Sequence, residues 1–256
     1  MPERFILITN DDGIDSPGLR AAVEAVIDLG EIIVVAPSTQ QTAMSRALYG
    51  AKDEYLKPLD FQIGETRVSA YHINASPAMA VQHAYNVLFF ERQPDLIISG
   101  INYGENLGWD SMLSGTVGAA FQGASQGTPA IAVSLQTEIE HHFVYGEVDW
   151  SAAKHFLKLY SERILKDGIC EGVKVLKIDV PAEATTETEW RYTKLADQHY
   201  FTAEIENPSL ESRLGDAKVK IKPIMDNLDK ESDIYALAVD KIVSVTPMNM
   251  DMSVHK

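Results

Sequence analysis

Two aspartates stand side by side early in the chain, in the stretch ILITNDDGIDSPGL at residues 6–19. Asp11 and Asp12 follow an apolar run that is typical of a strand buried on both faces. Two carboxylates held together at the end of such a strand repel each other. A divalent cation between them would relieve this repulsion. An ordinary Asp-Asp-Gly turn explains the dipeptide without any ligand, because both residue types favour turns.

Two further loops carry oxygen-bearing side chains after predicted strands. The first is STQQTAMS at 38–45, and the second is NYGENLGWDSMLSGT at 102–116, with Asn102 and Asn106. In an open α/β sheet, ligands bind beyond the carboxyl ends of the strands, so we expect these loops to meet the aspartates. No cluster of His or Cys accompanies them. The set therefore favours Mg²⁺ or Mn²⁺ over zinc and weakens the interpretation as a simple turn.

The stretch LSGTVGA within the second loop predicts the start of a helix. The first amides of a helix bind phosphate readily, and Gly115 would let a ligand approach the backbone. Ser114 or Thr116 could instead cap the helix, which by itself is the simpler explanation. Beside a metal site, phosphate binding becomes the better one.

The elements that would position these loops follow from the apolar pattern. Buried strands are predicted at 4–9, 31–37, 95–101, 129–135, 173–180 and 242–247, and helices at 17–29, 77–90, 114–127 and 150–165. The alternation predicts an α/β fold with a doubly wound, mostly parallel sheet. Residues 47–73 alternate and predict a β-rich excursion. We expect one domain over 1–256, with a core of about 1–181 plus 242–247 and an extension of about 182–241 plus the C-terminal tail.

Composition restricts the partners and the compartment. The formal net charge of −15 disfavours nucleic acid polymers and anionic membranes. Cys170 is the single cysteine, which fits a reducing compartment. The first ten residues hold too short an apolar run for a signal peptide, and no stretch approaches the roughly 20 apolar residues of a membrane span. We therefore expect a cytoplasmic protein.

Four stretches together resemble the SurE family, the survival-protein-E nucleotidases: ILITNDDGIDSPGL, VVAPSTQQTAMS, PDLIISGINYGENLGWDSMLSGTVGAA and VSVTPMNMD. The resemblance covers most of residues 4–135 and returns near the C-terminus. It implies a Rossmann-like core and a C-terminal extension that exchanges between subunits to give homodimers or homotetramers. It also implies a metal-dependent phosphatase acting on nucleoside 5'- and 3'-monophosphates, with short polyphosphate as a further substrate of some members.

The resemblance also assigns roles to individual residues. The implied metal ligands are Asp11, Asp12, Thr42 and Asn102, and the implied phosphate-binding residues are Asn106, Ser114, Gly115 and Thr116. The family usually has serine at the position of Thr42, and NASPAMAV replaces its usual Gly-Thr-Pro run, which leaves substrate preference open. The implied chemistry is attack by a metal-activated water. Asp11 and Asp12 are the catalytic candidates, with Asp11 favoured to orient or deprotonate the water.

Two alternative functions follow from the sequence. GASQG at 123–127 has the spacing of a hydrolase nucleophile elbow, but Ser125 follows a predicted helix and precedes a strand, which is the reverse of that motif. Close packing of small residues explains it better. The second alternative is a metal-dependent nucleotide sensor without turnover, since binding and catalysis would use the same ligands.

Overall fold

A central sheet organises the chain. The computed structural model describes residues 4–142 and 144–253, so residues 1–3, 143 and 254–256 of the predicted single domain lie outside the described part. Within it, nine strands form one sheet in the order β3-β4-β2-β1-β5-β6-β7-β11-β8. Their bounds are β1 (Phe5–Thr9), β2 (Glu31–Pro37), β3 (Lys57–Ile63), β4 (Thr66–Ile73), β5 (Leu96–Tyr103), β6 (Ala130–Leu135), β7 (Val175–Val180), β8 (Trp190–Tyr192) and β11 (Val243–Met248). The α-helices are α1 (Pro17–Val26), α2 (Pro77–Val87), α3 (Gly115–Ala124) and α4 (Ser151–Asp167).

Parallel pairing dominates the middle of this sheet. β1 pairs in parallel with β2 and β5, and the parallel order continues through β6 and β7. Every residue of β1, β6 and β7 is buried, as expected for strands covered on both faces. Antiparallel pairs occur towards the edges, between β3 and β4 and between β7 and β11. The predicted doubly wound, mostly parallel α/β sheet is confirmed.

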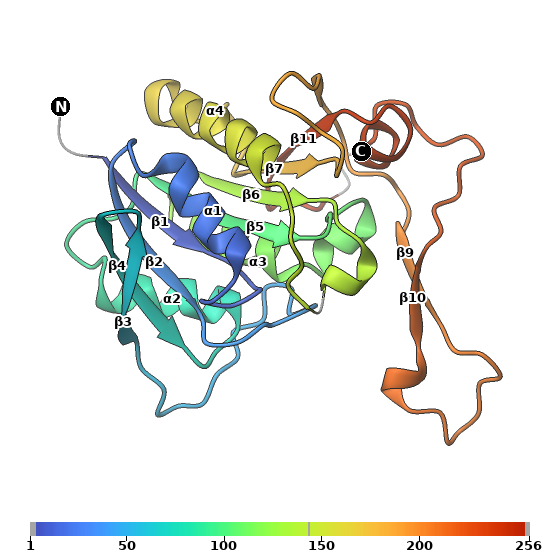
Figure 1. Ribbon diagram of the computed structural model, residues 1–256, viewed down its shortest axis with the longest axis horizontal. Coiled ribbons are helices and arrows are strands. Elements are labelled where there is room, and N and C mark those ends of the chain that lie inside the picture. Colours follow the sequence, from blue (N-terminus) through green and yellow to red (C-terminus); the bar gives the residue numbers. More distant parts are fainter. Residues whose placement is uncertain (1–3, 143, 254–256) are drawn as a thin grey trace.

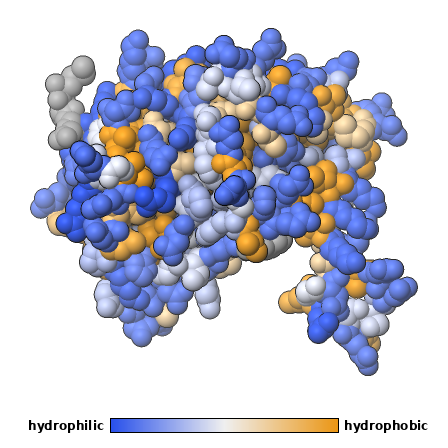
Figure 2. Space-filling view, in the orientation of Figure 1, coloured by the Kyte–Doolittle hydropathy of each residue, from blue (hydrophilic) through white to orange (hydrophobic). Residues whose placement is uncertain are grey.

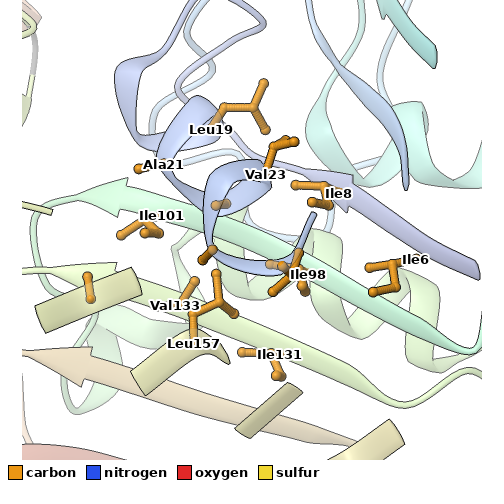
Figure 3. Close-up of a cluster of buried hydrophobic side chains, with 14 of the residues drawn as sticks. Ile6, Ile8, Leu19, Ala21, Val23, Ile98, Ile101, Ile131, Val133 and Leu157 are labelled. Carbon is orange, nitrogen blue, oxygen red and sulfur yellow. The ribbon is translucent and has the colours of Figure 1, made fainter. Parts of the chain in front are cut away.

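Helices cover both faces of the sheet (Figure 1). α1 and α4 pack on one face, and α2 and α3 on the other. Figure 3 shows Val23 of α1 beside Ile8 of β1, and Leu19 and Ile98 of β5 belong to the same buried cluster. The apolar spacing along α1 therefore buries one face of this helix against the strand that leads into the aspartates.

The end of α1 differs from the prediction. The helix ends at Val26, and the amide of Leu29 donates to the Val26 carbonyl at 2.9 Å in a turn that leads to β2. Gly30 serves a different purpose from the predicted helix stop. A Cβ on Gly30 would lie 2.4 Å from the carbonyl oxygen of Arg4, so the glycine allows the two strands' ends to approach.

The β-rich excursion predicted for 47–73 is a hairpin over 57–73, and residues 47–56 lead into it without forming a strand. β3 and β4 pair over their full length, and β4 adds in parallel to β2 at the edge of the sheet. The excursion thus extends the sheet and leaves the edge formed by the carboxyl ends of β1, β2 and β5 open.

The chain after β7 is less regular. β8 pairs with β11 in the main sheet, whereas β9 (Phe201–Glu204) and β10 (Lys218–Ile221) form a separate hairpin that projects from the body (Figure 1). Figure 2 shows this arm standing apart on a mostly hydrophilic face. The predicted boundaries of the extension stay a prediction. Among the described residues, no helix has the length and apolar character needed to cross a membrane.

Candidate active site

The aspartate pair, Asp11 and Asp12, lies just beyond the carboxyl end of β1 and is buried, with 7% and 3% of the two residues exposed. The turn that carries it is fixed locally. The side-chain amide of Asn10 donates to the Gly13 carbonyl at 3.0 Å, and its oxygen accepts from the Gly13 amide at 3.2 Å. Gly13 has φ +103°, and a Cβ there would lie 3.0 Å from the backbone of Thr39. A glycine is therefore needed where this turn meets the loop after β2.

The start of α3 packs directly on Asp11. The hydroxyl of Thr116 donates a hydrogen bond to Asp11 Oδ1. A Cβ on Gly115 would lie 2.7 Å from Asp11 Cβ, so only glycine fits there. The first positively polarised amides of α3 thus face the carboxylate. The structure brings together three of the residues that the sequence predicted for the site, Asp11, Gly115 and Thr116.

Asp12 is held by other elements. Its Oδ2 accepts a hydrogen bond from the Tyr103 amide at 3.1 Å, and its Oδ1 accepts one from Gln40 Nε2 at 3.3 Å. The hydroxyl of Tyr145 donates to the Asp12 carbonyl at 2.6 Å. The loops after β2 and β6 and the last residue of β5 therefore all reach the aspartate pair, which itself follows β1.

The surroundings of the aspartate pair disfavour its ionised form. Burial raises the pKa of the Asp11 carboxyl, although the Thr116 hydroxyl and the amides of Gly115 and Thr116 lower it in part. Burial also raises the pKa of Asp12, which rises further because the charge of Asp11 lies beside it. Among the described residues, no Lys, Arg or His forms an ion pair with either carboxylate. A buried pair of acids without a cationic partner fits a bound divalent cation.

Further oxygen ligands for such a cation must be amides or hydroxyls, because the described residues contain no group of three His, Cys, Asp or Glu that could hold a metal ion. Asn102 meets this requirement. Its Nδ2 donates to the carbonyls of Tyr103 at 3.2 Å and Gly104 at 2.7 Å, which leaves Oδ1 free of hydrogen bonds within the described structure. Its neighbour Tyr103 donates to Asp12. Asn102 therefore lies one residue from a direct contact with the aspartate pair, with its oxygen available.

Thr42 lies in the exposed part of the loop after β2. The amide of its neighbour Gln41 donates to the Asp11 carbonyl at 2.7 Å, which attaches this loop to the aspartate pair. Within the described residues, the Thr42 hydroxyl makes no hydrogen bond. Ser45, a further hydroxyl residue of this loop, donates to the Met112 carbonyl at 2.7 Å. Between Thr42 and Ser45, the Thr42 hydroxyl is therefore the one left available to a ligand.

The predicted phosphate-binding residues divide into two groups. The Ser114 hydroxyl accepts from the Val117 amide at 3.2 Å and caps α3, and the Thr116 hydroxyl is bonded to Asp11. Capping, the simpler explanation for these hydroxyls, therefore holds for Ser114. Asn106 instead contacts β6, where its Nδ2 donates to the Ser134 hydroxyl at 2.8 Å. No contact joins Asn106 to the aspartate pair in the described structure.

Sequence reasoning missed several residues that hold the site. Gln40 lay in a loop that was recognised for its amides, so its contact with Asp12 had a signal. Tyr145 lies in a stretch between β6 and α4 without periodic pattern, and nothing in the sequence marked its contact. Lys177 and Asp179 were part of a predicted strand, and only the structure shows that they contact Asn106.

Comparison with known proteins gives one consistent result. Residues 6–202 match the family model described as "Survival protein SurE". Relatives named "5'-nucleotidase SurE" from Thermococcus gammatolerans and Thermococcus kodakarensis are each 39% identical to this chain, and the matches cover 97% of it and 91% and 93% of the relatives. The crystal structure of the SurE protein from Aquifex aeolicus is similar with a TM-score of 0.75 and 27% identity, over 97% of this chain and 94% of that one.

Proposed function

Because the chain belongs to the SurE family, we propose that it is a metal-dependent phosphatase that hydrolyses nucleoside 5'-monophosphates to nucleoside and phosphate. The observation that carries this proposal is the buried aspartate pair, which has no cationic partner among the described residues and lies against the first amides of α3. This arrangement combines a place for a cation with a place for a phosphate. The names of the relatives support the nucleotide substrate. We extend the proposal to 3'-monophosphates and short polyphosphate on the family resemblance.

The residues that would hold a Mg²⁺ or Mn²⁺ ion are Asp11, Asp12, Thr42 and Asn102. When bound, such an ion supplies charge neutralisation for the phosphoryl group and makes a water molecule more acidic. The two aspartates and the Asn102 oxygen are anionic or neutral oxygen donors, which suit this class of ion. The Thr42 hydroxyl would complete the set from the loop that Gln41 attaches to Asp11.

The remaining groups would bind and orient the phosphate. The amides of Gly115 and Thr116 face the site and would hold phosphate oxygens, stabilising the charge that develops in the transition state. The side-chain amide of Asn106 would donate a further hydrogen bond to the phosphate. Ser114 would act through its cap, which keeps the first turn of α3 in place.

Asp11 is the better candidate to orient or deprotonate the attacking water. Helix amides and the Thr116 hydroxyl lower its pKa in part, whereas the charge of Asp11 raises that of Asp12 further. The hydrogen bonds from Thr116 and the first amides of α3 thus favour the ionised form of Asp11, which is the form that a general base requires.

The projecting arm suggests how copies of the chain would associate. Leu210 and Leu214, in the connection between β9 and β10, are fully exposed. Together with the family resemblance, these exposed leucines support a homodimer or homotetramer built through the extension. We also propose that the protein is cytoplasmic. Light scattering after size-exclusion chromatography would test the association, and a purely monomeric chain at micromolar concentration would contradict it.

Phosphate release tests the proposed function. The protein is treated with a chelator, and activity is then measured on a panel of 5'- and 3'-mononucleotides with Mn²⁺, Mg²⁺ or Zn²⁺ added back. We expect activity with Mn²⁺ or Mg²⁺ and little with Zn²⁺, because all the proposed ligands are oxygens. Full activity after exhaustive chelation would contradict the metal mechanism. Nucleotide binding without phosphate release would instead favour the sensor.

A further inference from the structure

A buried ion triad lies behind the loop that carries Asn106. It consists of Lys177 and Asp179 on β7 and Asp233 in the extension. All three side chains are fully buried. The Lys177 ammonium is paired with Asp179 and lies 3.1 Å from Asp233 Oδ2. Burial alone lowers the pKa of Lys177, but the two carboxylates raise it above its usual value, so the lysine stays charged.

The triad contacts the backbone of Asn106 on both sides. Lys177 Nζ donates to the Asn106 carbonyl at 2.6 Å, and the Asn106 amide donates to Asp179 Oδ1 at 2.8 Å. Two residues further on, the amide of Gly108 donates to Asp233 Oδ2 at 2.9 Å. The triad thus fixes the backbone of residues 106–108 by three hydrogen bonds to charged groups, which are stronger than those between neutral groups.

Asp233 also connects this loop to the extension. Its Oδ1 accepts from the amides of Ala196 and Ile234, each at 2.9 Å. The triad therefore forms hydrogen bonds both with the backbone of residues 106–108 and with the extension. Removing ions from water is unfavourable, and well-packed apolar residues could fill the same space at least as stably. A role in positioning the loop gives these charges a purpose that stability alone does not.

We propose that Lys177, Asp179 and Asp233 are positioning residues that fix the Asn106 loop for phosphate binding. This inference rests on the proposed function, because it gives Asn106 a phosphate to bind. Asn106 itself would meet the phosphate with its side chain, while the triad holds only its backbone. Loss of the triad should therefore act on phosphate affinity through Asn106.

A double-mutant cycle tests this dependence. Asp179→Asn, Asn106→Ala and the double variant are compared in their kcat and KM for 5'-AMP with Mn²⁺, and in their affinity for inorganic phosphate with Mn²⁺. We expect Asp179→Asn to raise KM and the phosphate Kd by about tenfold, as for other partners that orient a binding group, and to change kcat by less than about threefold. In the Asn106→Ala background, the same substitution should change both constants by less than about twofold, because the group that it positions is gone.

Hydrogen exchange of the full chain supplies a measurement that does not depend on activity. The amides of Asn106 and Gly108 should exchange at least about tenfold faster in Asp179→Asn than in the wild type. Lys194→Met is the matched control, because it removes the exposed ion pair with Asp229 but leaves the hydrogen bond from the Glu231 amide to Asp229 in place. It should leave KM, phosphate affinity and this exchange unchanged.

Two results would overturn the proposal. One is a tenfold effect of Asp179→Asn that persists in the Asn106→Ala background, since additivity would show a general structural role. The other is unchanged exchange at residues 106–108. If no nucleotide is hydrolysed and no phosphate binds, the proposed function fails, whereas the exchange result still decides whether the triad holds the loop.

Discussion

Two groups of buried aspartates lie at the same edge of the sheet and differ in what balances their charge. Asp179, near the carboxyl end of β7, and Asp233 share the ammonium of Lys177. Asp11 and Asp12, beyond the carboxyl end of β1, have no cationic side chain beside them in the described structure. The first group is internally neutralised to within one charge by a lysine, whereas the second has no cation of its own and its raised pKa values favour bound protons in the metal-free protein.

This difference distinguishes buried charges that stabilise the fold from buried charges that would serve a binding site. A charged group that a fold needs for its own stability is paired within the fold, because an unpaired buried charge is strongly unfavourable. A pair of buried acids left without a cationic partner therefore supports the proposal that a cation from solution binds there. Removing a charge should have opposite consequences for the stability of the two groups.

The largest effect is expected at the lysine. Lys177→Met keeps the length of the side chain but leaves Asp179 and Asp233 buried without a cation, so the free energy of unfolding should fall by about 3–5 kcal/mol. Urea denaturation of the metal-free protein measures it. Lys194→Met, which alters the exposed pair with Asp229, is the control and should change stability by less than about 1 kcal/mol. A loss below about 1 kcal/mol for Lys177→Met would remove the contrast between the two groups.

Asp12→Asn should have the opposite effect on the metal-free protein. Removing one of two repelling carboxylates should leave the melting temperature without metal at or above that of the wild type. Turnover should nevertheless fall by about 100-fold or more, because a proposed metal ligand is lost. Phosphate release and a thermal melt in chelator measure both. A metal-free melting temperature well below that of the wild type would show that the charge of Asp12 stabilises the fold.

Glu105 shows a third way to bury a carboxyl. Burial raises its pKa from 4.5 to about 7, although Gln136 Nε2 lies 3.4 Å from Oε1 and lowers it in part. The Tyr200 hydroxyl also lowers the pKa of this carboxyl in part, whereas the nearby charge of Asp179 raises it. A bound proton thus reduces the charge of Glu105, as the Lys177 ammonium offsets the charge of the acids in the triad.

The sign of the pH dependence follows from the raised pKa. The folded protein binds the Glu105 proton more tightly than the unfolded chain does, so its stabilisation is complete below about pH 4.5 and is lost as the pH rises through about 7. Glu105→Gln should match the wild type near pH 4.5 and be more stable by roughly 3 kcal/mol near pH 7.5. Urea midpoints of both proteins across this range measure it. A constant difference at all pH values would show that Glu105 is not protonated in the fold.

The smallest effect is expected at Thr42, where only a neutral ligand is proposed. Thr42→Ser keeps the oxygen and should retain substantial activity, whereas the nearly isosteric Thr42→Val should lose about tenfold in metal affinity and turnover. Mn²⁺ titration with phosphate release compares the two variants. If Thr42→Val binds Mn²⁺ as the wild type does, Thr42 is not a ligand, and Ser45 becomes the next hydroxyl to test despite its bond to Met112.

Much of the fold could be predicted because residues within or next to each strand and helix indicate that element. Continuous apolar runs gave buried strands such as β1 and β6, and Ser-Pro pairs marked the starts of α1 and α2. The end of α1 was wrong because Gly30 is required by a contact with Arg4, which is distant in the chain before folding. The adjacent acids of the aspartate pair were visible for the same local reason.

The triad could not be predicted, because it depends on a contact between segments that are distant in the sequence. Lys177 and Asp179 alternate within a strand, a pattern that ordinarily indicates a solvent-facing side. They are buried because the extension brings Asp233, 54 positions further along the chain than Asp179, onto that side. Tyr145 was missed for a similar reason, since a single hydroxyl in an irregular loop gives no pattern.

Calorimetric titration of the metal-free protein with Mn²⁺ tests the central claim, that the aspartate pair is the site of a cation from solution, most directly. We predict one ion bound per chain, with protons released in proportion to the raised pKa values of the pair, as shown by the dependence of the heat on the buffer. Asp12→Asn should abolish or greatly weaken binding, and Asp229→Asn should leave it unchanged. Binding that is the same in the wild type and in Asp12→Asn, or no binding to the wild type, would contradict the account.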